Sequence, residues 1–135
     1  MYHWLARYAD ALSAEGSGPY LEMWRRRYRR NAEPARIKEN FGFFDTLLAD
    51  LRAGRIAWDE AQRVGFFGDN DARLYFVGYE MAKAIDLHRS AKRVGELLEQ
   101  SPSAFFQEYI TLYRQQSGIV GRFTPETEAY FETLR

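Results

Sequence analysis

The chain contains no cysteine, and long apolar runs are also missing. Disulfide bonds, thiolate metal ligands, iron–sulfur clusters and a cysteine nucleophile are therefore excluded. No stretch approaches the roughly 20 apolar residues of a membrane span. The first residues, MYHWLARYADALSAEG, lack the basic start and continuous apolar core of a signal peptide. We therefore expect a soluble, cytoplasmic protein with no membrane contact.

An excess of charge is lacking too, since 19 basic residues balance 19 acidic ones. No global field favours nucleic acid. The basic stretch WRRRYRR, residues 24–30, could pair with phosphates or with an acidic protein partner. Trp24 and Tyr28 lie one helical turn apart and are expected to face the core, which leaves the arginines as a solvated rim. We therefore expect no nucleic-acid partner.

Alternation of apolar and polar residues, the pattern of a half-buried strand, is nearly absent, and GIVGRF is the one weak exception. Spacings of three and four predict helices instead. The length of 135 residues and an apolar fraction of 46% suit one ordinary domain with a sizeable core. The sequence thus predicts an all-α fold, a single compact domain over residues 1–135 with about six to eight helices.

The predicted helices begin and end at recognisable residues. Proline suits a first helical turn, serine or threonine suits an N-cap, and Gly54 stands where a left-handed C-terminal cap is expected. The following ranges are expected to be helical: 2–14, 19–30, 34–53, 57–64, 72–89, 90–98, 102–116 and 125 onward.

Gly78 interrupts the apolar helix RLYFVGYEMAKAIDLHRS, residues 73–90. Glycine inside a helix costs about 1 kcal/mol relative to alanine, so something is expected to need the space of its missing side chain. Close contact with another helix is one explanation. A functional site beside Tyr75 and Tyr79 is the other.

The same stretch, with the LLEQSPSAFFQEY that follows it, resembles the C-terminal helical region of bacterial zinc-dependent peptidases of the gluzincin kind. The residues that carry the resemblance are Tyr75, Gly78, Met81, Ala82, Ile85, Pro102, Phe105, Phe106 and Tyr109. It covers about 35 residues closely and about 100 loosely. The resemblance implies Glu15, followed by Gly16, as a third zinc ligand, and Tyr75 or Tyr79 as the group that stabilises an oxyanion.

The zinc-binding signature of such enzymes, H-E-x-x-H, is missing from this sequence. That motif places two imidazoles one turn apart on Zn²⁺ with a glutamate to activate the bound water. Only His3 and His88 are present, and neither has a second histidine at i+3 or i+4. GDND, residues 68–71, resembles the start of a calcium loop, but the later glutamate is absent and a turn is favoured. We expect no cofactor for the chain alone, and zinc only if a segment with the motif completes the site.

Two functions remain open. In the first, the chain is a C-terminal portion or a non-catalytic remnant of a zinc-peptidase-like protein and supplies a wall of the substrate cleft. In the second, it is a helical interaction module that binds a protein or peptide through an aromatic groove near Phe66 and Phe67. Either function is compatible with a homo-oligomer.

Overall fold

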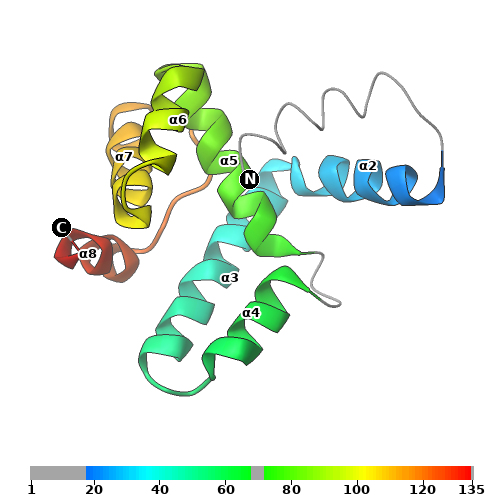
Figure 1. Cartoon of the computed structure of the whole chain (residues 1–135), viewed down its shortest axis with the longest axis horizontal. Helices are drawn as coiled ribbons and strands as arrows, with labels where there is room; N and C mark the ends of the chain where they lie inside the picture. The colour runs from blue at the N-terminus through cyan, green and yellow to red at the C-terminus, as the bar shows by residue number, and fades with distance from the viewer. Residues whose placement is uncertain (1–17, 68–71, 135) are drawn as a thin grey trace.

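In the computed structural model, residues 18–67 and 72–134 are described. They form seven helices and no strand (Figure 1), which confirms the predicted all-α class. The helices are α2 (Pro19–Asn31), α3 (Pro34–Arg52), α4 (Trp58–Phe66), α5 (Arg73–His88), α6 (Ala91–Leu98), α7 (Pro102–Gln115) and α8 (Pro125–Thr133). The predicted helix over residues 2–14 and the GDND segment lie outside the described residues.

The helix ends follow the local signals in the sequence. The hydroxyls of Ser90, Ser101 and Thr124 each accept a hydrogen bond from the backbone N–H three residues on, and so act as N-caps of α6, α7 and α8. Gly54 has φ of +67° directly after α3, the left-handed conformation that glycine adopts without strain. GIVGRF lies in the connection between α7 and α8 and forms no strand.

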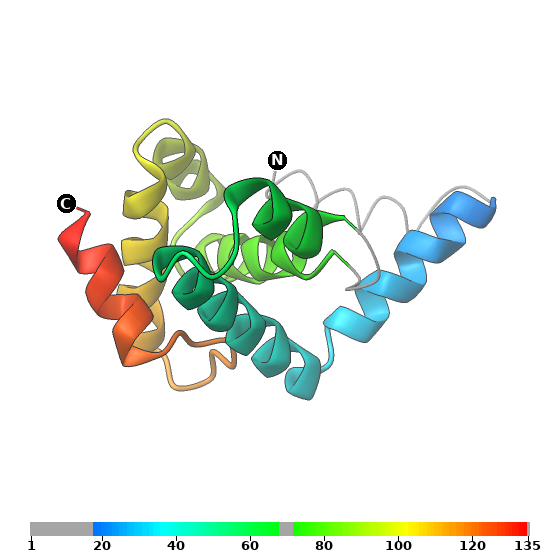
Figure 2. The same cartoon turned by 90° about the horizontal axis from the view of Figure 1, so that it is seen from below.

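Helix α5 lies at the centre of the described structure, as its wide apolar surface predicts. It packs against α2, α3, α4, α6 and α7. Its most buried side chains are Met81, Ala82 and Ile85, all at most 1% exposed. Viewed from two directions, α2 extends away from the other helices, while α8 lies at the opposite side of the molecule, against α7 and α3 (Figures 1 and 2).

The last helix reaches its position through an extended segment that is fixed at two points. The Tyr109 hydroxyl of α7 donates a hydrogen bond of 2.7 Å to the Gly121 carbonyl. The Asp45 carboxylate of α3 accepts one of 3.1 Å from the Thr124 N–H, at the start of α8. These bonds hold α8 beside α3.

Candidate functional site

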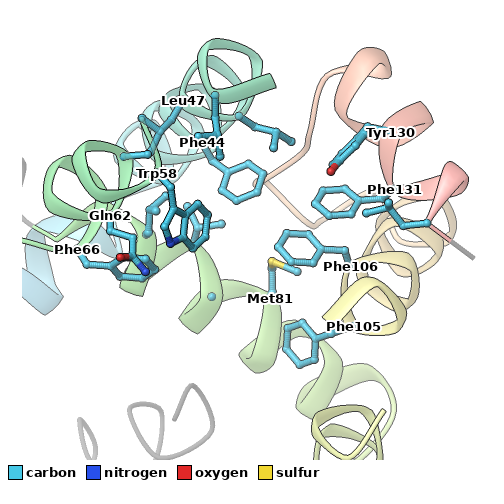
Figure 3. Close-up of a pocket in the computed structure, with 17 residues that line it drawn as sticks. Phe44, Leu47, Trp58, Gln62, Phe66, Met81, Phe105, Phe106, Tyr130 and Phe131 are labelled. Carbon is cyan, nitrogen blue, oxygen red and sulfur yellow. The ribbon is translucent and has the colours of Figure 1, made fainter. Parts of the chain in front are cut away.

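An apolar cavity of about 380 Å³ lies between five of the helices, α3, α4, α5, α7 and α8 (Figure 3). This volume is near the lower end of the range of about 300–1,000 Å³ that is usual for ligand pockets. The cavity is lined by Phe44, Leu47, Leu48, Leu51, Trp58, Ala61, Gln62, Phe66, Leu74, Val77, Gly78, Met81, Phe105, Phe106, Tyr130, Phe131 and Leu134.

Helix α5 forms the floor of the cavity with one face. Leu74, Val77, Gly78 and Met81 recur at helical spacing and all line it. The predicted placement of Gly78 on the face of Leu74 and Met81 is therefore confirmed, and the glycine is buried. Because Gly78 has no side chain, the cavity is deeper at this position than it would be with a larger residue.

Helix α4 lies close against α5 at another glycine, Gly65. A Cβ atom there would stand 2.3 Å from Leu74 Cδ1, well inside van der Waals contact. Such a separation requires either a glycine or a displaced leucine. Gly65 thus lets α4 lie against α5, and this contact carries Phe66 and Trp58 to the side of the cavity.

Stacked aromatic rings form the opposite wall. The Phe106 ring of α7 and the Phe131 ring of α8 lie 4.0 Å apart between centres and nearly parallel, at 11°. Phe44 of α3 packs against both, with centre distances of 5.6 Å and 6.4 Å. Since each ring is held by the other two, this wall is expected to be preformed before any ligand binds.

Few polar groups reach the cavity. They are the Gln62 amide, the indole N–H of Trp58 and the Tyr130 hydroxyl, and all three side chains appear in Figure 3. Trp58 is 63% exposed, so its indole forms part of the cavity wall and also contacts solvent. The cavity is therefore suited to an apolar group that enters from the surface.

The two tyrosines predicted as site residues lie outside the cavity lining. Tyr79 is buried, and its hydroxyl oxygen lies 2.5 Å from that of Tyr28 on α2. Tyr75 packs its ring edge against Phe66, with centres 5.0 Å apart. Phe66 links Tyr75 to the cavity, because its ring packs against that of Tyr75 and also lines the wall.

The residues that could bind zinc do not come together in the described part of the chain. Glu15 and His3 lie outside it, and His88 is exposed at the end of α5. Within residues 18–67 and 72–134, no three histidine, aspartate or glutamate side chains are grouped as metal ligands. Two imidazoles and a carboxylate, the set that a gluzincin zinc site requires, cannot be assembled from these residues.

The buried carboxylates have other surroundings. Glu80 of α5 is half-buried, and burial raises its pKa although Lys83 Nζ lies 3.6 Å from Oε1. Burial also raises the pKa of Asp45, against hydrogen bonds from Thr127 and Thr124 that act to lower it. Both groups lie apart from the cavity lining, so they affect stability more directly than binding.

Residues 18–67 and 72–134 thus form an all-helical fold with an apolar cavity among its helices. A family model described as "Putative zinc dependent peptidase (DUF5700)" matches residues 8–118. The chain belongs to this family, in agreement with the resemblance found in its sequence. A search of curated proteins and a search of solved structures each give no match. None of the described helices has the length and apolar character needed to cross a membrane.

Several cavity residues were not singled out from the sequence. Trp58, Gln62 and Tyr130 reach the cavity from α4 and α8, two short helices whose positions depend on long-range packing. Of the two phenylalanines predicted to form an aromatic groove, Phe66 lines the cavity and Phe67 is 63% exposed. The 63% exposure of Trp58 and of Phe67 is visible only in the structure, so the sequence alone offered no such signal.

Proposed function

We propose that these helices form a wall of a peptide-binding cleft in a zinc-peptidase-like protein, with the cavity accepting one apolar side chain of the peptide. The observation that carries this proposal is the cavity itself, a hollow of about 380 Å³ with almost entirely apolar walls. Burying a phenylalanine or leucine side chain contributes about 1.5–3 kcal/mol. A peptide would gain that amount here without reorganising the protein.

In this proposal the chain binds substrate and does not hydrolyse it alone. The sequence has no H-E-x-x-H, and the described residues do not supply an alternative ligand set. Zinc would be held by a segment that carries the motif, outside these 135 residues. Glu15 as a third ligand, and Tyr75 or Tyr79 as an oxyanion-stabilising group, stay predictions that depend on such a segment.

Calorimetric titration with zinc, together with a casein hydrolysis assay, tests the division of roles. We expect no turnover from this chain. Tight binding of one zinc ion per chain accompanied by casein cleavage would contradict the proposal, because it would assign the chemistry to these residues.

Peptide binding tests the cavity. We expect an acetylated and amidated pentapeptide with a central phenylalanine to bind about tenfold more tightly than the same peptide with serine, as measured by calorimetry. Gln62→Trp should fill the cavity from its exposed rim and remove this preference. Arg63→Trp is the matched control, because Arg63 is exposed on the same helix and does not line the cavity. Equal binding of the two peptides would refute the proposed role.

The exposure of Phe67 and Trp58, each 63%, favours a second candidate function, a module that binds a partner helix across the surface. Binding of an amphipathic helical peptide would then require Phe67. We expect Phe67→Ser to weaken such binding while leaving the short phenylalanine peptide unaffected. The reverse pattern would favour the cavity alone.

A further inference from the structure

A cationic side chain, Arg52, lies at the margin of the cavity. The Arg52 guanidinium lies over the ring of Tyr130, with its carbon atom 4.3 Å from the ring centre. Tyr130 itself lines the cavity, and Figure 3 shows its ring extending from α8 with the hydroxyl at the far end. One aromatic ring therefore separates a positive charge from the apolar hollow.

The guanidinium is not engaged by the surrounding helix. In the last turn of α3, the Ala49, Asp50 and Leu51 carbonyls accept hydrogen bonds from the backbone N–H groups of residues 53, 55 and 54. The nearby Asp50 carboxylate pairs with Arg55 at 2.7 Å. Within the described ranges, no carboxylate forms an ion pair with Arg52.

Three carboxylates on the neighbouring helices α8 and α4 are already paired with other arginines. On α8, Glu128 and Glu132 both pair with Arg114 of α7. On α4, the carboxylate of Glu60 lies 3.6 Å from the guanidinium of Arg63. The Tyr130 hydroxyl has no hydrogen-bond partner among the described residues. Two donors, a guanidinium and a phenol, are thus available next to an apolar cavity.

We propose that the cavity binds the C-terminal residue of a peptide, with its apolar side chain in the hollow and its α-carboxylate on Arg52 and the Tyr130 hydroxyl. This inference rests on the proposed function and adds to it the part of the peptide that is recognised. A carboxylate is the group that a planar guanidinium and a phenol bind together, because it accepts hydrogen bonds at two oxygens. An internal peptide residue carries no charge at this position.

Calorimetry with the whole chain tests the inference, using a tripeptide of two alanines and a C-terminal phenylalanine, acetylated at its N-terminus. The free acid is compared with the C-terminal amide. We expect the acid to bind about fivefold more tightly, the size of effect suited to one solvent-accessible charged hydrogen bond. Arg52→Gln should remove most of the preference for the acid and leave the affinity of the amide unchanged.

Two further variants separate the proposed contacts from general effects. Arg55→Gln removes a neighbouring exposed charge that is paired with Asp50, and should preserve the preference for the acid. Tyr130→Phe keeps the ring and removes the hydroxyl, and should reduce the preference by about half. Thermal melting of each variant checks that it is folded.

The possible results are distinct. Equal affinity for acid and amide, or an equal loss for both in Arg52→Gln, would overturn this inference and leave the cavity proposal standing. Failure of both peptides to bind would overturn the two together. Dodecanoate binding at the cavity without peptide binding would assign the same chemistry to a lipid acid, and would also overturn the inference.

Discussion

The hydroxyl oxygens of Tyr28 and Tyr79 lie 2.5 Å apart, and their rings meet edge to face at 83° with centres 5.3 Å apart. Tyr28 lies on α2 and Tyr79 lies in the middle of α5. This contact therefore joins the helix that extends away from the others to the central helix. Tyr79 was predicted as a site residue from a family resemblance. In the structure, Tyr79 also has a structural role, because it holds α2 against α5.

Tyr79→Phe removes one partner of this hydrogen bond. We expect a loss of about 1 kcal/mol in the free energy of unfolding, measured by urea denaturation. Tyr28→Phe should cost a similar amount, and the double variant should cost less than the sum, because both changes break the same bond. Fully additive effects would show that the two hydroxyls do not interact in solution.

Gly121 supports the segment that leads to α8. A Cβ atom at this position would stand 2.4 Å from Phe41 Cε2, and the Phe41 ring is 1% exposed and cannot move freely. We expect Gly121→Ala to destabilise the protein by about 1–3 kcal/mol in chemical denaturation. Gly95→Ala is the control: this helical glycine meets nothing within 4 Å, so alanine should stabilise by up to about 1 kcal/mol. Matching effects of the two variants would contradict the close contact with Phe41.

Glu80 should make stability fall as pH rises. Burial raises its pKa above the ordinary 4.5, so the folded protein holds this proton more tightly than the unfolded chain. Stability is then lost as pH increases from the ordinary pKa through the folded one. We expect Glu80→Gln to raise Tm at about pH 7 and to have a smaller effect at about pH 4. Exposed Glu99→Gln serves as the control; a lower Tm for Glu80→Gln at neutral pH would contradict this account.

Glu108 should show the opposite dependence. Burial acts to raise its pKa, but hydrogen bonds from Arg93 and Arg89 outweigh this, and the pKa is lowered. The resulting stability is present above the ordinary pKa of 4.5 and is lost as pH falls through the folded value. We expect Glu108→Gln to lower Tm at about pH 7, with the difference shrinking in acid. A constant difference across this pH range would show that the carboxylate charge is not responsible.

Local features of the fold were predictable, and the cavity was not. Ser101 followed by Pro102 announces a helix start whatever surrounds it, because cap and first turn are satisfied by neighbouring residues. The hollow depends instead on where α8 folds back, which is set by contacts such as Asp45 with Thr124, 79 residues apart. Periodicity indicates that a residue such as Phe44 or Phe131 lies on the apolar face of its helix. It cannot show that a space remains between the two helices.

Part of the candidate site was also predictable from the sequence. The family was recognised from residues of α5 and α7, and Gly78 was placed on the correct face of its helix. The predicted tyrosines lie about 100° or more around α5 from that face. Once the cavity-lining face is known, helical spacing alone shows that Tyr75 and Tyr79 point away from it. Their proposed chemistry, and that of Glu15, stays a prediction.

The indole of Trp58 gives this molecule a built-in optical reporter. It forms part of the cavity wall while remaining 63% exposed, so its fluorescence should shift to the blue when an occupant displaces the water around it. Replacing the two other tryptophans of the sequence, Trp4 and Trp24, with phenylalanine would leave a single emitter. Occupancy could then be followed in real time, without labels and without knowing the natural ligand in advance.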